Sequence, residues 1–462
     1  MTAPHDLSPQ PGPRPSARIL KIVGVLALVA MFVAGVVSFL PGGLGGVLGR
    51  VGPPEVEGNI VWDSEDLAVQ LGPNGWLTHP AGGGDYAARN VRTGTSWTIG
   101  DLASQMSISH EGVVVQPDGT KVLVQREGST RTVTTKDIAD EQGDDDLWPG
   151  ENVDLVAFGE EHVVVATCLA PSPSRLLDEV EGGHVVFAGL SLEDASIAWV
   201  RDVGARCGGD FWHPGKPKTL PAQPYVLLEP SEDHLVVVDV ATGETVLSRS
   251  GQARYKIAIH GDRVLVEEDE GEVAWRSLRT GKEITRVRCD GARVGSTGDI
   301  SRQVPPEGTP FVECADSVRV LDGDRVVEID AQPLGLGEGR LPEGRDVAVG
   351  RHVMHREGKV VTVRDGLEDK EIGRLDVPED FEVAGWTSPG RLLVFASVDT
   401  GGERPTSAYR AFDARTGELV LSTSGGMRTG ADVSPDGVIV VESDDEDLEG
   451  TRLWVAATTE TP

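Results

Sequence analysis

A short hairpin turn that recurs along the chain is the feature that most constrains its fold. The clearest copies are Asp239–Gly243 (Asp-Val-Ala-Thr-Gly) and Asp413–Gly417 (Asp-Ala-Arg-Thr-Gly), and weaker copies begin at Asn90 and Ser277. An apolar-rich stretch precedes and follows each copy. Gly adopts a positive φ without strain, and Asp or Asn can hydrogen-bond the turn backbone. The pattern therefore predicts antiparallel hairpins repeated along the chain.

Two kinds of hairpin alternate after residue 57. Eight outer hairpins are predicted at Tyr86–Ile99, Lys121–Thr135, His184–Val203, His234–Ser248, Gly271–Val287, Asp316–Asp330, Gly358–Asp376 and Ala408–Thr423. A second element, with a strongly apolar strand, occurs at Val156–Val165, Ile257–Val266, Gly385–Val394 and Val433–Val441. Copied units of four strands are typical of a β-propeller, in which the central strands of each blade are apolar on both faces.

The number of blades depends on how the last units are read. The eight hairpins and a C-terminal half-unit, Gly430–Ala456, give a literal count of nine. We expect the unit around Cys289–Asp330 to be irregular or merged with its neighbour. The prediction is therefore an all-β protein with a single β-propeller of eight blades, with seven as the alternative. Asn59–Asp63 is predicted to supply the strand that the half-unit lacks, which closes the ring and removes exposed edges.

The repeats resemble the quinoprotein-like (PQQ-like) propeller family. Its signature is Asp-x-x-Thr-Gly followed four residues later by a Trp that docks between blades. Leu247 and Leu421 occupy the Trp positions of the two clearest copies, Trp199 occupies it in the unit at Ser191, and Trp97 lies one residue short. The turns at Ser434–Gly437 and Pro117–Gly119 resemble TolB-type repeats. Family members that bind the quinone carry an adjacent cysteine pair and calcium ligands. This chain has no Cys-Cys, so we predict no cofactor.

The amino-terminal segment predicts the location of the protein. Residues 22–40 are 19 uncharged, mostly apolar residues, and as a helix they span roughly 28 Å, close to the thickness of a bilayer core. Arg14, Arg18 and Lys21 precede them, which places the amino terminus in the cytoplasm. We therefore predict a disordered cytoplasmic tail (1–18), a single transmembrane helix (19–40), a Gly/Pro linker (41–57) and an extracytoplasmic propeller (58–458). A cleaved signal peptide is the alternative.

The four cysteines, Cys168, Cys207, Cys289 and Cys314, all follow the predicted membrane span. An even number in an oxidising compartment predicts two disulfides. Pairing of sequence neighbours gives Cys168–Cys207 and Cys289–Cys314, each within about one unit, although four cysteines allow three connectivities. A zinc site is the rival interpretation, but no Cys-x-x-Cys spacing supports it.

Charge and motifs restrict the chemistry. The chain carries a formal net charge of −32, and the residues after 55 hold 38 basic and 72 acidic side chains, so nucleic-acid binding is not expected. Nucleophile elbows, Walker loops and His-Glu-x-x-His motifs are absent. The acidic runs Asp144–Asp146 and Asp444–Glu449 lack calcium-loop spacing. We predict no catalytic, cofactor-binding or metal-binding residues. Four tryptophans are expected to pack between blades: Trp76, Trp148, Trp212 and Trp386.

Three functions are compatible with these features. The first is a membrane-anchored protein-binding or scaffold module in the bacterial cell envelope, with Leu169–Gly183 and Arg206–Ala222 as contact segments and a cell-envelope protein or unknown ligand as partner. The second is a propeller enzyme, either a quinoprotein-type oxidoreductase or a hydrolase or lyase, which a cofactor absorption band or converging carboxylates in a central pocket would favour. The third is a ligand sensor that signals through the cytoplasmic tail.

Overall fold

A computed structural model describes most of the chain after residue 55. The described residues are 56–64, 70–82, 84–99, 106–143, 148–170, 183–207, 222–231, 234–250, 257–268, 271–295, 303–304, 311–334, 341–376, 386–387, 391–399, 406–423, 431–434, 436–445 and 450–459. They belong to one compact unit, residues 54–462. The predicted tail (1–18) and membrane helix (19–40) lie outside them. Within the described ranges, no helix is long and apolar enough to cross a membrane.

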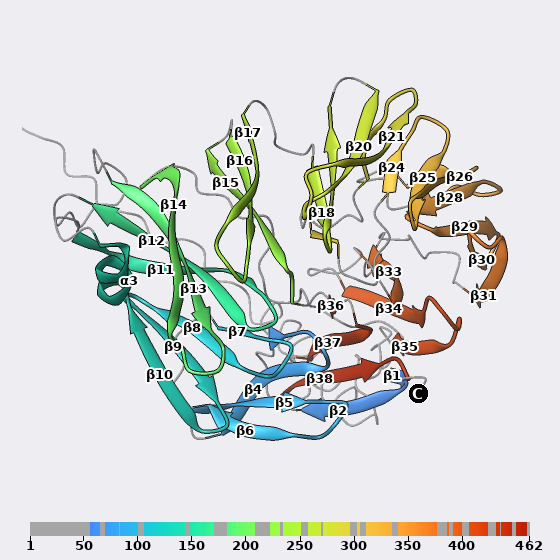
Figure 1. The fold of residues 1–462 in the computed structure, drawn as a ribbon. Coiled ribbons are helices and arrows are strands. Elements are labelled where there is room, and N and C mark those ends of the chain that lie inside the picture. Colours follow the sequence, from blue (N-terminus) through green and yellow to red (C-terminus); the bar gives the residue numbers. More distant parts are fainter. Residues whose placement is uncertain are drawn as a thin grey trace, which may run out of the picture. The chain divides into compact units, whose positions relative to one another are not determined.

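The strands form nine sheets, which we number as blades in chain order (Figure 1). Blade 1 contains β3 (Gln70–Leu71), β4 (Trp76–Gly82), β5 (Asp85–Asn90) and β6 (Ser96–Ile99). Blade 2 contains β7 (Ser107–Ile108), β8 (Val114–Asp118), β9 (Lys121–Arg126) and β10 (Ser129–Thr134), and helix α3 (Thr135–Gln142) follows it. Blade 3 contains β11 (Trp148–Phe158), β12 (His162–Ala170), β13 (His184–Ser191) and β14 (Ile197–Arg206).

The middle blades continue the series. Blade 4 contains β15 (Tyr225–Ser231), β16 (His234–Asp239) and β17 (Thr245–Ser250). Blade 5 contains β18 (Ile257–His260), β19 (Arg263–Glu267), β20 (Glu272–Ser277) and β21 (Glu283–Arg288), with β23 (Gln303–Val304) parallel to β18. Blade 6 contains β22 (Arg293–Val294), β24 (Phe311–Glu313), β25 (Val318–Asp322) and β26 (Arg325–Ile329).

The last three blades complete the set. Blade 7 contains β27 (Gln332–Pro333), β28 (Asp346–Val349), β29 (His352–Glu357), β30 (Val360–Asp365) and β31 (Lys370–Asp376). Blade 8 contains β32 (Trp386–Thr387), β33 (Leu392–Asp399), β34 (Thr406–Asp413) and β35 (Leu419–Thr423), to which β1 (Val56–Gly58) is added. Blade 9 contains β36 (Ala431–Val433), β37 (Val438–Asp445) and β38 (Gly450–Ala457), to which β2 (Ile60–Ser64) is added.

The predicted hairpin turns form as their residues dictate. In the turn after β16, the Asp239 carboxylate accepts hydrogen bonds from the backbone N–H groups of Ala241 (2.9 Å) and Thr242 (3.0 Å). The N–H of Gly243, at a φ of 70°, donates to the Asp239 carbonyl at 2.8 Å. Asp413 organises the turn after β34 in the same way. All eight predicted outer hairpins are present as pairs of adjacent strands.

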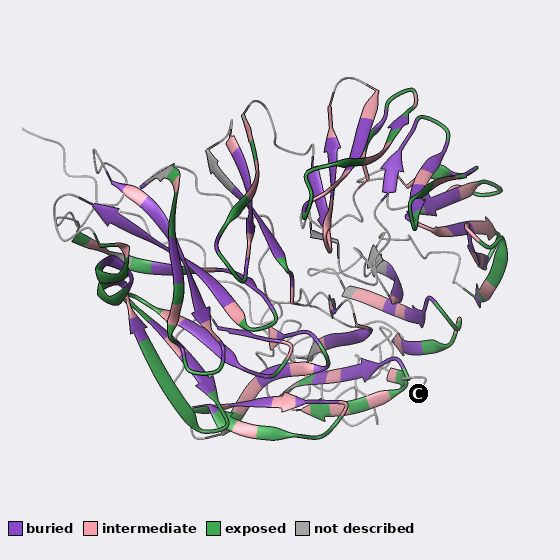
Figure 2. Cartoon of the chain, viewed as in Figure 1, coloured by how far each residue is buried: buried purple, intermediate pink, exposed green. Residues whose placement is uncertain are grey.

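Apolar clusters between neighbouring sheets close the propeller. Each of nine buried clusters contains residues of two consecutive blades, and the cluster that contains Leu71, Leu77 and Val91 of blade 1 also contains Val438 and other residues of blade 9. Every blade thus packs against two others, as the blades of a ring do. Buried residues follow the central strands, whereas outer strands such as β10 are largely exposed (Figure 2).

The prediction of eight blades, with seven as the alternative, is wrong. The unit around Cys289–Asp330 forms a sheet of its own, blade 6, instead of merging with a neighbour. Phe311 and Val318 pack toward blade 7, and Val312 and Cys314 pack toward blade 5, so this sheet has two apolar faces like the others. Its first two described strands have two and three residues. Strands this short show no period in the sequence.

Strands β1 and β2, which we call the closing strands, join the last two blades. β2 pairs antiparallel with β38, so the predicted closure through Asn59–Asp63 is confirmed. The pairing of β1 with β35 is an addition that the sequence did not predict. Between the two strands, Asn59 donates its backbone N–H to the Val420 carbonyl of blade 8 (2.9 Å) and its side-chain amide to the Ala457 carbonyl of blade 9 (2.7 Å).

Gly58 allows this crossover. Its φ is 134°, and a Cβ at this position would overlap the carbonyl oxygen of Val420. A side chain is therefore excluded both by the backbone conformation and by the close approach of β35.

The imidazole of His352 makes the stability of blade 7 sensitive to acid. Burial, together with the positive charge of Arg351, lowers the pKa of His352 to about 4, although Asp365 opposes the shift. The unfolded chain binds this proton near pH 6.5, before the folded chain does, so the free energy of unfolding falls as the pH drops from 6.5 to 4. We expect the wild-type protein to lose about 1–3 kcal/mol more over this range than His352→Gln, because His352 is half-buried. Urea unfolding of both proteins across the range measures the difference, and parallel curves would contradict the assignment.

Candidate functional site

One disulfide ties the end of blade 3 together. Cys168 lies on β12 and Cys207 follows β14, so the bond reaches across β13, which lies between these two strands. Both cysteines are buried. The prediction of two disulfides is confirmed, and of the three connectivities the structure has the one between sequence neighbours.

Both predicted contact segments start beside this bond. Leu169–Gly183 connects β12 to β13, and Arg206–Ala222 starts at the last residue of β14. Residues 171–182 and 208–221 lie outside the described residues, but the ends of both segments are within them. The backbone N–H of Cys207 donates to the carbonyl of Gly183 at 3.3 Å. The two segments are therefore rooted next to each other on one blade.

Trp148 is exposed at the same end of blade 3. It is the first residue of β11, where it pairs with Ala170, and 54% of its surface is exposed. Ala170 in turn packs against the disulfide. The prediction that Trp148 packs between blades is therefore wrong. Trp76 does pack against the cluster between blades 1 and 2, whereas Trp212 and the side chain of Trp386 lie outside the described residues.

The second disulfide joins two blades. Cys289 follows β21 of blade 5, and Cys314 follows β24 of blade 6. The expectation that this bond lies within one unit is wrong, because the chain between the two cysteines begins a new sheet. Both cysteines contact the apolar cluster between the two blades.

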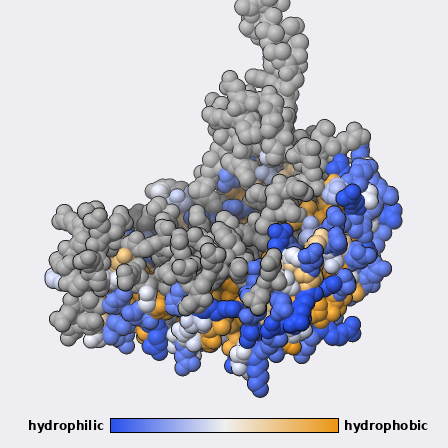
Figure 3. Space-filling model, turned by 90° about the horizontal axis from the view of Figure 1, so that it is seen from above, coloured by the Kyte–Doolittle hydropathy of each residue, from blue (hydrophilic) through white to orange (hydrophobic). Residues whose placement is uncertain are grey.

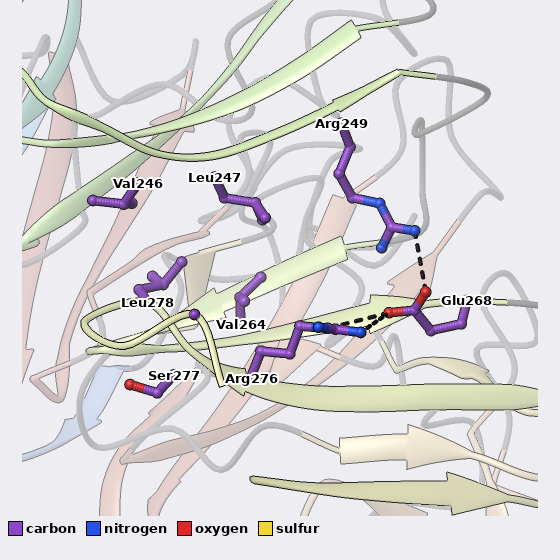
Figure 4. Close-up of a pocket in the computed structure, with 9 residues that line it drawn as sticks. Val246, Leu247, Arg249, Val264, Glu268, Arg276, Ser277 and Leu278 are labelled. Atoms are coloured by element: carbon purple, nitrogen blue, oxygen red, sulfur yellow. Dashed lines mark hydrogen bonds and ion pairs between the residues drawn. The ribbon is translucent and has the colours of Figure 1, made fainter. Parts of the chain in front are cut away.

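A cavity of about 240 Å³ lies between blades 4 and 5. Its walls come from β17 on one side and from β19, β20 and the following turn on the other (Figure 4). The lining residues are Val246, Leu247, Arg249, Val264, Glu268, Arg276, Ser277, Leu278 and Gly281. No motif in the sequence identified these residues, since they are contributed by two separate repeats.

The charged end of the cavity is built around Glu268. Its carboxylate accepts hydrogen bonds from Arg276 at 2.8 Å and from Arg249 at 3.2 Å, and Figure 4 shows both guanidinium groups directed at it. Burial raises the pKa of the Glu268 carboxyl, but the hydrogen bond from Arg276 and the charges of both arginines outweigh burial and lower it. Glu268 is therefore ionised at neutral pH. Arg276 also lies 3.7 Å from Glu283, which is connected through further ion pairs to Arg286, Glu272 and Arg288, so four arginines and three glutamates together leave one positive charge. Such a group suits the binding of an anion better than the donation of a proton.

Hydrophilic and apolar side chains are interspersed on the described part of the face shown in Figure 3. In the part of the chain that the structure describes, no group of three or more His, Cys, Asp or Glu side chains is arranged to hold a metal ion. The acidic run Asp144–Asp146 and most of Asp444–Glu449 lie outside that part.

No protein-family model matches the chain, and no curated protein matches it. It is similar to solved structures of BamB from Moraxella catarrhalis (12% identity over 80% of this chain and 97% of that chain, TM-score 0.33), a eukaryotic initiation factor (9%, 84% and 92%, TM-score 0.45) and the WD40 domain of SCAP from fission yeast (8%, 87% and 98%, TM-score 0.42). Overlaps this weak support no argument. The assignment to the β-propeller fold rests on the nine mutually packed sheets of the chain itself.

Proposed function

We propose that the chain is a membrane-anchored, extracytoplasmic propeller that binds a protein of the cell envelope, as a binding or scaffold module, through the end of blade 3. One observation carries the proposal: the Cys168–Cys207 bond roots both long segments beside the exposed side chain of Trp148. The proposal assigns the chain no reaction and no cofactor. The uncharged stretch 22–40 and the basic residues before it support the anchor and its orientation.

Preorganisation of the two contact segments favours the binding of a partner. Tryptophan is enriched among the residues that dominate the energy of protein interfaces. A contact segment whose ends are fixed loses less conformational entropy on association than a free one. The disulfide fixes one end of each segment at the same end of one sheet.

The repeats also support membership of the quinoprotein-like repeat family. Trp199 donates its indole N–H to the carbonyl of Val240 in the next blade at 2.9 Å, which is the docking that the resemblance implies. We propose this membership for the repeat alone and not for the cofactor chemistry of the family.

Cross-linking in intact cells followed by purification of the full-length protein tests the proposal. We expect Trp148→Ala to reduce capture of the partner by about 30-fold, since loss of an interface anchor weakens binding by about 2 kcal/mol. Deletion of residues 171–182 should act in the same direction. Val360→Ala is the matched control, because Val360 is also an exposed apolar side chain but lies on blade 7. Equal capture by all four proteins would refute the contact surface.

A further inference from the structure

The Trp199 side chain fills the space between blades 3 and 4, a contact that we call the blade 3–4 joint. Its indole Nε1 donates to the Val240 carbonyl at 2.9 Å, and a Cβ on Gly243 would lie 2.5 Å from the ring. Val240 and Gly243 belong to the hairpin turn of blade 4. The indole of one blade therefore fills the space between its own outer strand and the turn of the next blade.

The next joint has the same parts but lacks the ring. Leu247 occupies the position on β17 that Trp199 occupies on β14. In the turn of blade 5, Leu278 and Gly281 are the equivalents of Val240 and Gly243, the two residues that contact Trp199. A Cβ on Gly281 would meet nothing within 4 Å. Among the described residues, none donates a hydrogen bond to the Leu278 carbonyl. Leu247, Leu278 and Gly281 all line the cavity, which is thus an indole slot that the described chain leaves open.

The size and walls of the cavity suit an aromatic ring. A cavity of about 150 Å³ with apolar walls binds benzene, so the volume of about 240 Å³ found here admits a bicyclic ring. Val246, Val264 and Leu278 provide apolar walls. The Leu278 carbonyl occupies the turn position of the Val240 carbonyl, which accepts the indole N–H of Trp199.

The charged end of the slot determines which side chain suits the position next to the aromatic residue in a bound segment. Arg249 and Arg276 both pair with Glu268, and Arg276 also pairs with Glu283. With Arg286, Arg288 and Glu272, the connected ion pairs comprise four arginines and three glutamates, so one positive charge remains in a chain whose net charge is −32. Arginine pairs favourably with carboxylates. An acidic side chain next to the aromatic residue is therefore the complementary group.

The outer edge of β17 has no partner strand among the described residues. In blade 8, β1 adds to the outer edge of β35, and the side chains of Val420 and Leu421 are 3% and 0% exposed. The corresponding residues of β17, Val246 and Leu247, are only half-buried. The molecule itself thus shows that the outer strand of a blade accepts an added strand.

We propose that the slot between blades 4 and 5 binds an extended segment of a partner protein. The segment adds as a strand to β17, inserts a tryptophan side chain against Leu247 and Gly281, and places an acidic side chain against Arg249 and Arg276. This mode combines strand addition with a side-chain pocket. The inference rests on the proposed function, because it names the chemistry of a bound protein.

Fluorescence anisotropy with labelled peptides tests the slot in the full-length protein. The probes are acetyl-Thr-Val-Glu-Trp-Glu-Val-amide and the same peptide with alanine in place of tryptophan. We expect the tryptophan peptide to bind at least about tenfold more tightly than the alanine peptide. Equal binding of the two peptides overturns the inference. This assay uses no cellular partner. If the peptide does not bind but capture in cells still depends on Trp148, the slot is refuted and the proposed function is not. If the peptide binds but capture does not depend on Trp148, the slot is supported and the proposed contact surface is refuted.

A double variant tests where the peptide binds. Val237→Gly with Leu247→Trp rebuilds the blade 3–4 joint at blades 4–5, since Gly189 lies opposite Trp199 and Val237 lies opposite Leu247. We expect this double variant to lose peptide binding because its own indole fills the slot. Unchanged binding by the folded double variant overturns the proposal.

Charge reversal at Arg249 tests the contact with the acidic side chain. Arg249→Glu is expected to weaken binding of the tryptophan peptide by about tenfold, the effect of losing one charge-assisted hydrogen bond. Arg131→Glu is the matched control, because Arg131 is an exposed arginine on the outer strand of blade 2, which does not line the slot. Equal effects of the two reversals overturn the assignment of the acidic side chain to Arg249.

Discussion

Removal of residues 1–64 is expected to unfold the propeller, whereas removal of residues 1–53 is expected to leave its unfolding temperature unchanged. The longer deletion takes away both closing strands, with the hydrogen bonds of β1 to β35 and of β2 to β38. It also removes Val56, Ile60 and Trp62, which pack against the clusters on either side of blade 9. The loss is on the order of 5 kcal/mol, comparable to the whole stability of a typical domain. Thermal unfolding followed by circular dichroism measures it.

A single substitution provides a finer test of the same closure. Gly58→Ala places a side chain at a φ of 134° against the backbone of β35, and we expect it to lower the free energy of unfolding by about 1–3 kcal/mol. Gly94→Ala is a suitable control, since Gly94 also has a positive φ, but a Cβ there meets nothing within 4 Å. If the two substitutions have the same effect, the close packing of β1 on blade 8 is not what constrains Gly58.

Loss of the disulfides should have the second-largest effect. In the chain-entropy account, a bond that closes a loop of 39 residues contributes about 4 kcal/mol, and one that closes 25 residues contributes about 3.5 kcal/mol. We therefore expect Cys168→Ser with Cys207→Ser, and Cys289→Ser with Cys314→Ser, to be destabilised by about these amounts. Urea unfolding under oxidising conditions measures both.

The reduced wild-type protein supplies the control for these variants. It should unfold at the same urea concentration as the quadruple variant, since neither contains a bond. A quadruple variant as stable as the oxidised wild-type protein would contradict the contribution assigned to the disulfides.

The features that were predictable from the sequence are local. Turns such as Asp239–Gly243 depend on residues a few positions apart, so their chemistry can be read directly. The closing role of Asn59–Asp63 was also predictable, because an incomplete last unit requires a strand from elsewhere. Blade 6 was missed because β22 and β24 are too short to show alternation.

The candidate sites were much less predictable. Trp148 was expected to pack between blades. Nothing near it in the sequence shows that β11 begins beyond the region where neighbouring blades contact each other. The cavity combines residues of two repeats, and only packing brings Glu268 and Arg249 together. One signal was available in advance: Leu247 stands where the repeat signature has tryptophan, and a smaller side chain at a docking position leaves space beside the next blade.

The closing strands also impose an order on biosynthesis. Asn59 and its hydrogen-bond partner Ala457 are separated by 398 positions, so the first strands to leave the ribosome meet their partners only when synthesis is nearly complete. At about 5–20 residues per second, this interval lasts roughly 20–80 s. Throughout it, β1 and β2 present unpaired edges of the kind that recruit other chains. A nascent chain of this protein therefore depends on protection of the eight residues of β1 and β2 until its last blade has been made.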